Sequence, residues 1–313
     1  MSMLTASAPG KVILFGEHAV VYGRPAIVCA ISRRVRVTAE LAGDGVVVEQ
    51  RGVRQRLRLG GEGKPRGRFR YVAAAVEEAF REAGRRSGVR LSIRSELPEA
   101  AGLGSSAAVS VATLLAVLRL LGAEVSPGRL AELGHRVELR VQGAASPTDT
   151  AISAHGGMLY IHGGGYERLT PPELRLVVGD TRVKRRTADL VARVRSLHRR
   201  HERVVESLLD AIGAVTLAAR GEVERHSARR LGELMNINHH LLEALGVSTP
   251  ELNRLVHAAR AAGAEGAKLT GAGGGGCMVA LAQERHGEVL EALSSSCSAF
   301  SVEVSAEGAV IEG

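Results

Sequence analysis

Residues 98–108, with the sequence PEAAGLGSSAA, join an expected strand to an expected helix through a glycine-rich loop. The residues before it, 91–97, alternate as a strand does, and residues 105–121 have the Ala and Leu content of a helix with a glycine directly after it. In this context Gly102 and Gly104 can adopt positive φ, so that backbone amides approach phosphate oxygens closely. The start of the helix adds unpaired N–H groups and about half a positive charge. The loop therefore predicts a phosphate-binding site.

The same loop differs from the two commonest nucleotide-binding motifs. No Gly-Lys-Ser/Thr follows it, which excludes a Walker A loop, and its glycine spacing is not that of a dinucleotide-binding fold. A serine-capped helix after a simple glycine turn is the alternative without a ligand. At average residue usage the run GLGSSAA occurs by chance on the order of 10⁻⁸ per position, which favours the functional interpretation.

Composition indicates an intracellular globular protein. The chain has 313 residues, 45% of them hydrophobic, which is enough for one large or two medium domains. No apolar run is long enough to span a bilayer, and the first ten residues lack the pattern of a secretory signal, so we expect a cytoplasmic protein without membrane contact.

The H-x-x-H pair His198 and His201 has no nearby Cys or acidic partner, so we expect a solvated helix face rather than a zinc site. Three cysteines without C-x-x-C spacing fit a reducing compartment: Cys29, Cys277 and Cys297.

The formal net charge of +8 and the pI near 10.0 raise nucleic-acid binding as an alternative function. Arginines gather in residues 51–70, 182–186 and 193–203. However, aromatic residues make up only 3% and Trp is absent, which leaves few platforms for stacking bases. In residues 54–59, RQRLRL, alternation places three arginines on one strand face and both leucines on the other. We therefore expect no nucleic-acid partner, and a salt-dependent shift assay would test this.

Apolar spacing predicts an irregular mixture of strands and helices, which indicates an α+β fold rather than a doubly wound one. The expected strands are 11–15, 27–39, 46–48, 54–59, 91–97, 175–179, 264–269, 276–281 and 298–304. The expected helices are 69–83, 105–121, 129–141, 188–209, 211–220, 227–245, 250–262 and 284–293. A loop is expected at 143–147, and the pattern pauses at Thr170-Pro171-Pro172. This pause predicts an N-terminal domain of residues 1–170 and a C-terminal domain of residues 171–313.

Two further motifs flank the phosphate loop. Residues 8–23 read APGKVILFGEHAVVYG, and residues 268–277 read KLTGAGGGGC. Together and in this order, the three motifs resemble those of the GHMP kinases. The resemblance extends from about Pro9 to Val304. It implies a ribosomal-S5-like N-terminal domain, a ferredoxin-like C-terminal domain and an active site in the cleft between them.

Within that family, the first motif resembles the mevalonate kinase branch. Galactokinases usually follow Gly-Glu-His with Thr-Asp-Tyr, homoserine kinases lack this acid–His pair, and phosphomevalonate kinases continue differently after Pro-Gly-Lys. The resemblance implies ATP- and Mg²⁺-dependent phosphorylation of the 5-hydroxyl of mevalonate, with mevalonate and ATP as the small-molecule partners; a homodimer is compatible with such a chain. The alternatives are another GHMP kinase, such as phosphomevalonate kinase, and a non-catalytic ATP-binding sensor. Intact Lys11, Glu138 and Asp149 argue against the sensor, since a sensor would tolerate their loss.

The resemblance also implies roles for individual residues. Asp149, in the segment SPTDT of residues 146–150, is the expected catalytic base, and Lys11 is expected to stabilise the forming alkoxide. Ser106 and Glu138 are the expected Mg²⁺ ligands, since Mg²⁺ prefers oxygen donors. The expected nucleotide-binding residues are Pro98, Ala101, Gly102, Leu103, Gly104, Ser105, Ser106 and Ala107. The expected substrate-site residues are Glu17, His18, Thr187 and Gly273.

The phosphate loop departs from the family pattern at one position. Family loops usually carry Gly where this chain has Ala100, two residues before Gly102. If that position requires positive φ, Ala is mildly strained there, and ATP binding would be weaker.

Overall fold

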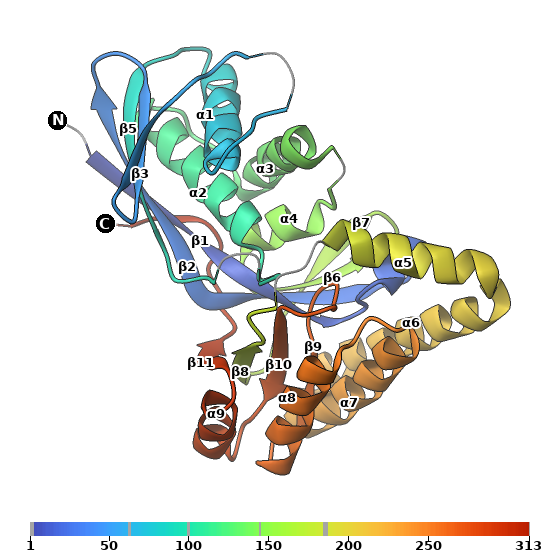
Figure 1. Ribbon diagram of the computed structural model, residues 1–313. Helices are drawn as coiled ribbons and strands as arrows, with labels where there is room; N and C mark the ends of the chain where they lie inside the picture. Colours follow the sequence, from blue (N-terminus) through green and yellow to red (C-terminus); the bar gives the residue numbers. More distant parts are fainter. Residues whose placement is uncertain (1–2, 62–63, 99–100, 144, 184–186, 313) are drawn as a thin grey trace.

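The computed structural model describes residues 3–61, 64–98, 101–143, 145–183 and 187–312 (Figure 1). Ala100 of the phosphate loop and residues 184–186 of the second arginine-rich segment thus lie outside the described residues. Within these ranges eight strands form one sheet, in the order β12-β1-β2-β5-β3-β4, with β6 paired to both β2 and β7. The strands are β1 (Met3–Phe15), β2 (Ala26–Ala42), β3 (Val46–Gln50), β4 (Val53–Leu57), β5 (Gly88–Ser95), β6 (Met158–His162), β7 (Gly165–Leu169) and β12 (Val310–Glu312).

The long strands β1 and β2 form the backbone of this sheet. β2 has two successive partners on one side, because its first part pairs with β6 and its second part with β5. The antiparallel register of β1 on β2 shifts between Pro9 and Lys11 and again between Ile13 and Phe15. Such bulges re-aim side chains, and they frequently lie beside active sites. Here the first bulge directly precedes Lys11.

Four helices cover one face of the first sheet (Figure 1). They are α1 (Arg70–Glu82), α2 (Ser105–Leu120), α3 (Pro127–Gln142) and α4 (Thr148–His155). α2 lies at the centre of this layer, and almost every residue from Ala107 to Leu118 is buried, which explains its uniformly apolar sequence. α3 begins where Ser126 accepts a hydrogen bond from the Arg129 amide and Pro127 occupies the first turn. The phosphate loop therefore starts the central helix of the domain.

The second sheet has the antiparallel order β11-β8-β10-β9. Its strands are β8 (Arg175–Asp180), β9 (Gly266–Leu269), β10 (Cys277–Leu281) and β11 (Ser298–Glu303). The remaining helices are η1 (Ala19–Tyr22), α5 (Thr187–Arg200), α6 (Glu202–Glu224), α7 (Ala228–Ala244), α8 (Pro250–Ala261) and α9 (His286–Ser294). Both faces of this sheet are buried: on β8, Leu176 and Val178 join the core of the first sheet, whereas Val177 joins the core under α8 and α9. The two sheets therefore share a continuous apolar interior.

The chain returns to the first sheet at its end, where β12 pairs with the beginning of β1 (Figure 1). The last strand of the described chain therefore belongs to the sheet built by the N-terminal half. The mixed α+β architecture confirms the predicted fold class. In the described part of the chain, no helix combines the length and apolarity needed to cross a membrane.

Some element predictions were wrong. The expected helix break between residues 209 and 211 does not exist, because α6 runs through it. The break lies instead at His201, whose φ of −136° and ψ of 50° leave the helical region between α5 and α6. The sequence analysis also missed α4, the β6–β7 hairpin and β12. These are short elements of three to eight residues, and α4 and β6 are buried throughout most of their length, so they lack the periodicity of a one-sided element.

Candidate active site

The phosphate loop has the geometry that its glycines predicted. Gly102 has a φ of 85° and Gly104 a φ of 73°, both in the left-handed region. Gly104 precedes the first turn of α2, and its carbonyl accepts the Ala108 amide at 2.9 Å. The three amides before that bond are the orphan donors that a helix start offers to an anion. This arrangement can cradle phosphate oxygens at the positive end of α2.

Lys11 lies directly against this loop. Its amide donates to the Leu103 carbonyl at 2.9 Å, and a Cβ added at Gly104 would lie only 2.8 Å from the Lys11 Cγ. Gly104 is thus required both for its positive φ and for the space that Lys11 occupies. Leu103 and Ala101 are buried, so within the expected set they shape the loop rather than present side chains to a ligand.

Lys11 forms an ion pair with Asp149. The Lys11 Nζ is 3.2 Å from the Asp149 Oδ1; the lysine side chain is 5% exposed and the aspartate 32%. Asp149 lies in the first turn of α4, where the helix dipole favours a carboxylate. Ser153, one turn later, donates to the Pro9 carbonyl at 3.0 Å and fixes α4 to β1 next to the bulge. The bulge, this hydrogen bond and the start of α4 together position the pair.

Glu138 on α3 lies beside the start of α2. The Ser106 hydroxyl donates to its Oε1 at 2.9 Å, and the Gln142 side-chain amide lies 3.5 Å from the same oxygen. Burial, and secondarily the charge of Asp149, raise the pKa of Glu138 to about 7, against smaller opposing effects of Ser106 and Lys11. Burial and the charge of Glu138 also raise the pKa of Tyr71, at the start of α1. Two expected metal ligands are therefore adjacent, with Asp149 within electrostatic range.

The oxygen donors of this cluster suit a hard divalent cation. Mg²⁺ commonly uses one or two carboxylates together with substrate phosphates, and Ser106, Glu138 and Asp149 supply such oxygens beside the phosphate loop. Among the described residues, no group of three or more His, Cys, Asp or Glu side chains is arranged to hold a metal by itself. The expectation that the H-x-x-H pair has no acidic partner was wrong for His198, because its Nε2 lies 2.5 Å from the Glu206 Oε1 and its side chain is only 20% exposed.

Glu17 and His18 occupy the turn after β1. His18 has a φ of 60°, is buried, and has its Nε2 2.9 Å from the Ala272 carbonyl in the C-terminal glycine loop. Glu17 is 1% exposed and forms a buried ion pair with Lys268, while the Asn238 side chain donates to its Oε2 at 3.0 Å. Glu17 is thus positioned to support the turn that carries His18 rather than to contact a ligand itself.

The C-terminal glycine loop closes against several elements. Gly273 has a φ of 73°, and a Cβ there would lie 2.1 Å from the Val247 carbonyl oxygen. A Cβ on Gly274 would lie 3.0 Å from the Leu190 side chain, three residues after Thr187. Thr187 itself is exposed at the start of α5. The start of α5 and the glycine loop are therefore neighbours, which brings these two expected substrate-site positions to one region.

Sequence reasoning missed the residues that join the two sheets. Thr270 donates its hydroxyl to the Ile13 carbonyl at 3.0 Å and accepts the Ile13 amide at 2.9 Å. Lys268 reaches across from β9 to Glu17 and to the Ile13 carbonyl at 3.4 Å. Both residues stand in the quoted motif KLTGAGGGGC, but only its glycines were considered. Asn238 carries no comparable signal in the sequence.

The geometry agrees with comparisons to known proteins. Residues 70–157 match the family model described as GHMP kinases N terminal domain, and residues 219–299 match that described as GHMP kinases C terminal. The fold and the site thus define a GHMP kinase.

Individual relatives show to which branch of the GHMP kinases the chain is most similar. The mevalonate kinase of Pyrococcus horikoshii is 48% identical over 305 residues, covering 92% of this chain and 91% of that protein. That of Thermococcus sibiricus is 47% identical, covering 92% of each. The crystal structure of Methanococcus jannaschii mevalonate kinase superposes with a TM-score of 0.88 at 30% identity, over 97% of this chain and 98% of that one. This chain belongs to the mevalonate kinase family.

Another similar structure is that of a complex with R-mevalonate. L. major mevalonate kinase in complex with R-mevalonate superposes with a TM-score of 0.83 at 27% identity, covering 95% of this chain and 94% of that one.

Proposed function

We propose that this protein transfers the γ-phosphoryl group of ATP to the 5-hydroxyl of mevalonate in the presence of Mg²⁺, giving 5-phosphomevalonate and ADP. The observation that carries the proposal is the Lys11–Asp149 pair, 3.2 Å apart and packed against the phosphate loop at Gly104. A hydroxyl bound beside this pair would lie next to phosphates cradled by the start of α2.

Asp149 and Lys11 have complementary roles in this proposal. The Asp149 carboxylate accepts the proton of the substrate hydroxyl. At the same time the hydroxyl oxygen bonds to the γ-phosphorus, and the bond between the γ-phosphorus and the oxygen that bridges it to the β-phosphate breaks, so that ADP leaves. The Lys11 ammonium offsets negative charge on the attacking oxygen and on the transferred group. Its 5% exposure strengthens this interaction, because charges act over a lower dielectric when water is excluded.

Ser106 and Glu138 are the proposed Mg²⁺ ligands from the protein. Bound there, the ion would neutralise phosphate charge during transfer. Because the pKa of Glu138 is raised to about 7, its carboxyl group is protonated in a fraction of the molecules at neutral pH when no metal is bound. A metal ion and a proton therefore compete for this carboxylate.

Mevalonate as the substrate is supported by relatives and by the first motif. The relatives named mevalonate kinase match over nearly the whole chain, and a structural neighbour is described as a complex with R-mevalonate. We assign the acceptor side of the site to His18 with the adjoining Gly273 and Thr187 region. Glu17 is assigned to supporting His18.

A coupled ADP-release assay tests the proposal. The enzyme is given ATP and Mg²⁺ with mevalonate, phosphomevalonate, galactose or homoserine in turn, and Asp149→Asn is compared with Asp44→Asn, an exposed turn residue. We expect turnover with mevalonate alone, a kcat reduced by at least about a hundredfold in Asp149→Asn, and no change in Asp44→Asn. Turnover with a different acceptor would refute the substrate assignment. ATP binding without turnover on any acceptor would favour the non-catalytic sensor.

A further inference from the structure

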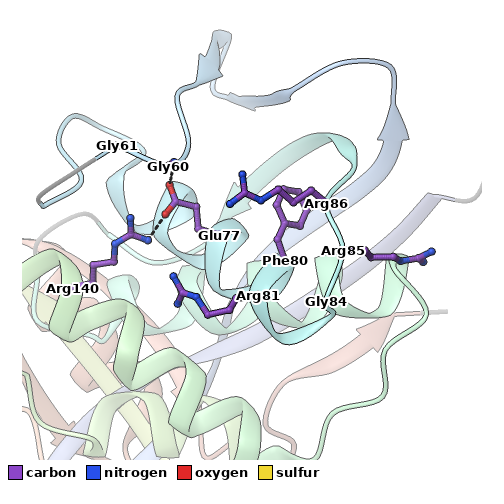
Figure 2. A pocket seen from close by; sticks show the side chains of 9 residues that line it. All are labelled: Gly60, Gly61, Glu77, Phe80, Arg81, Gly84, Arg85, Arg86 and Arg140. Atoms are coloured by element: carbon purple, nitrogen blue, oxygen red, sulfur yellow. Dashed lines mark hydrogen bonds and ion pairs between the residues drawn. The ribbon is translucent and has the colours of Figure 1, made fainter.

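A cavity of about 550 Å³ lies beside α1 (Figure 2). It is bounded by the glycine turn after β4, the second half of α1 with the turn that follows, and the end of α3. Its lining residues are Gly60, Gly61, Glu77, Phe80, Arg81, Gly84, Arg85, Arg86 and Arg140. Four arginines and one glutamate thus line a space of the size that small ligands occupy, and three of the arginine side chains, those of Arg81, Arg86 and Arg140, extend toward the same side (Figure 2).

The cavity is separate from the proposed active site. Tyr71 at the start of α1 lies by Ser106 and Glu138, whereas Phe80 and Arg81 lie at the opposite end of the same helix. Ten residues from Tyr71 to Arg81 span about 15 Å of α-helix. Arg140, which also lines the cavity, is two residues after Glu138 on α3, which is about 200° around the helix, so the two side chains leave α3 on opposite faces. A ligand in this cavity therefore would not contact the phosphate loop.

Glu77 and Arg140 form the anchored side of the cavity. The Glu77 carboxylate pairs with the Arg140 guanidinium and accepts the Gly60 amide at 2.8 Å (Figure 2). The side chains of Glu77 and Arg140 are mostly buried, at 12% and 28% exposure. These two contacts link the glycine turn to α1 and α3 on this side of the cavity.

Carboxylates do not fully neutralise the guanidinium charges of the other three arginines, Arg81, Arg85 and Arg86. Arg81 pairs with Glu78, but Glu78 is shared with Arg136 at 3.3 Å. Arg85 donates to the Leu121 carbonyl, a neutral acceptor. Within the described part of the chain, Arg86 has no ion pair or hydrogen bond. Its side chain extends toward the same side as Arg81 and Arg140, whereas Arg85 points the opposite way (Figure 2).

We propose that this cavity is a second anion site, which binds a small compound carrying a diphosphate or several phosphate groups. Guanidinium forks bind phosphate oxygens in pairs, and several of them around one space favour a multiply charged ligand over a single carboxylate. The backbone on the cavity wall is accessible, since a Cβ added at Gly60, Gly61 or Gly84 would meet no atom within 4 Å. Phe80, 5% exposed, adds an apolar patch to the floor.

The test is a titration with inorganic diphosphate, followed by NMR on protein labelled with ¹⁵N-glycine. The amides of Gly60, Gly61 and Gly84 report on the cavity, and those of Gly102 and Gly104 report on the phosphate loop. We expect saturable shifts at both groups of glycines, with independent binding curves. In Arg81→Gln/Arg86→Gln the affinity read at the cavity glycines should fall by at least about tenfold, since charge-assisted hydrogen bonds are lost. The binding curve read at the phosphate loop should stay as in the wild type.

A matched control separates a site from general charge effects. Arg229→Gln/Arg254→Gln removes the same charge from side chains that are 89% and 75% exposed on α7 and α8. This control should leave the cavity affinity unchanged. Absence of saturable shifts at Gly60, Gly61 and Gly84, an equal loss of affinity in the control, or equal affinity for inorganic sulfate at the same ionic strength would each overturn the proposal.

Discussion

Gly104 is the residue at which the phosphate loop and the catalytic lysine depend on each other. Its φ of 73° is unfavourable for other residues, and a Cβ would lie 2.8 Å from Lys11 Cγ. Gly104→Ala should therefore strain the loop by about 1–3 kcal/mol and displace Lys11 from Asp149. We expect a higher KM for ATP and a lower kcat together, measured by steady-state kinetics.

The control for this prediction is Gly128→Ala. Gly128 lies in the first turn of α3 without positive φ, and an added Cβ meets no atom within 4 Å. Replacement there should stabilise the fold by up to about 1 kcal/mol and leave the kinetics unchanged. If Gly104→Ala behaved like this control, the coupling between the loop and Lys11 would be wrong.

Glu138 gives the metal-free protein a defined pH dependence. Its pKa is raised from 4.5 in the unfolded chain to about 7 in the fold, so between these values the folded state holds a proton that the unfolded state has released. Stability should then fall as pH rises from about 5 to about 8, by on the order of 3 kcal/mol relative to Glu138→Gln. Urea unfolding of both proteins with EDTA measures the difference, and parallel pH profiles would contradict the raised pKa.

At the scale of elements, α7 and β9 approach through two glycines. A Cβ on Gly232 would lie 2.5 Å from the Glu265 backbone, and one on Gly266 would lie 2.2 Å from the Gly232 carbonyl oxygen. Asn236 completes the contact by accepting the Ala267 amide at 3.0 Å and donating to the Glu265 carbonyl at 3.2 Å. This backbone-to-backbone contact brings Asn238, further along α7, within reach of Glu17.

Gly232→Ala should therefore push α7 away from β9. Overpacking of this kind costs about 1–3 kcal/mol, which thermal or urea unfolding measures. Because Asn238 moves with α7, kcat should fall as well, although Gly232 is not in the proposed site. A matched change at Gly221, on α6, where an added Cβ meets only the Arg225 side chain, should have much less effect. Equal effects of the two substitutions would exclude the close-approach argument.

The elements that the sequence predicted are those with one-sided periodicity or clear end signals. α2 and α8 were placed within one residue of their observed ends, because Ser105 and Pro250 begin them and the apolar spacing continues to their last turns. By contrast, the first four residues of β6 are buried and the strand lies between glycines, and the partner of β12 in the described part of the chain is the distant β1. At His201 neither Gly nor Pro marks the break, so the helical pattern runs on across it.

The candidate site was predictable where a local motif defines backbone geometry. Gly102 and Gly104 have the positive φ that phosphate binding requires, and the Lys11–Asp149 proximity implied by the family resemblance is present. The support of the site was not predictable, because the pairing of Glu17 with Lys268 joins residues 251 positions apart. Such partners depend on how the two sheets pack, and neither residue's spacing in the sequence indicates the other.

At the scale of the whole molecule, a few buried polar contacts fasten the second sheet to β1. The Thr270 hydroxyl hydrogen-bonds both to the backbone amide and to the backbone carbonyl of Ile13. Lys268 adds the ion pair with Glu17. All of these lie within a few residues of Lys11 on one side and the glycine loop on the other. The relative placement of the phosphate loop and the acceptor region is therefore set by this interface.

The Lys268–Glu17 pair is the most sensitive point of that interface, because both side chains are buried, at 0% and 1% exposure. Burial lowers the pKa of Lys268, opposed by Glu17, so neither charge is solvated well enough to stand alone. Lys268→Met should leave Glu17 as an uncompensated buried charge and reduce the free energy of unfolding by about 3–5 kcal/mol. The double variant Glu17→Gln/Lys268→Met removes both charges, and the amide oxygen of the new glutamine can still accept the hydrogen bond from Asn238. The series also includes the single variant Glu17→Gln. The double variant should therefore recover much of the stability, and urea unfolding of all four proteins gives the coupling free energy. Additive losses in the two single variants would mean that the pair does not couple the two sheets.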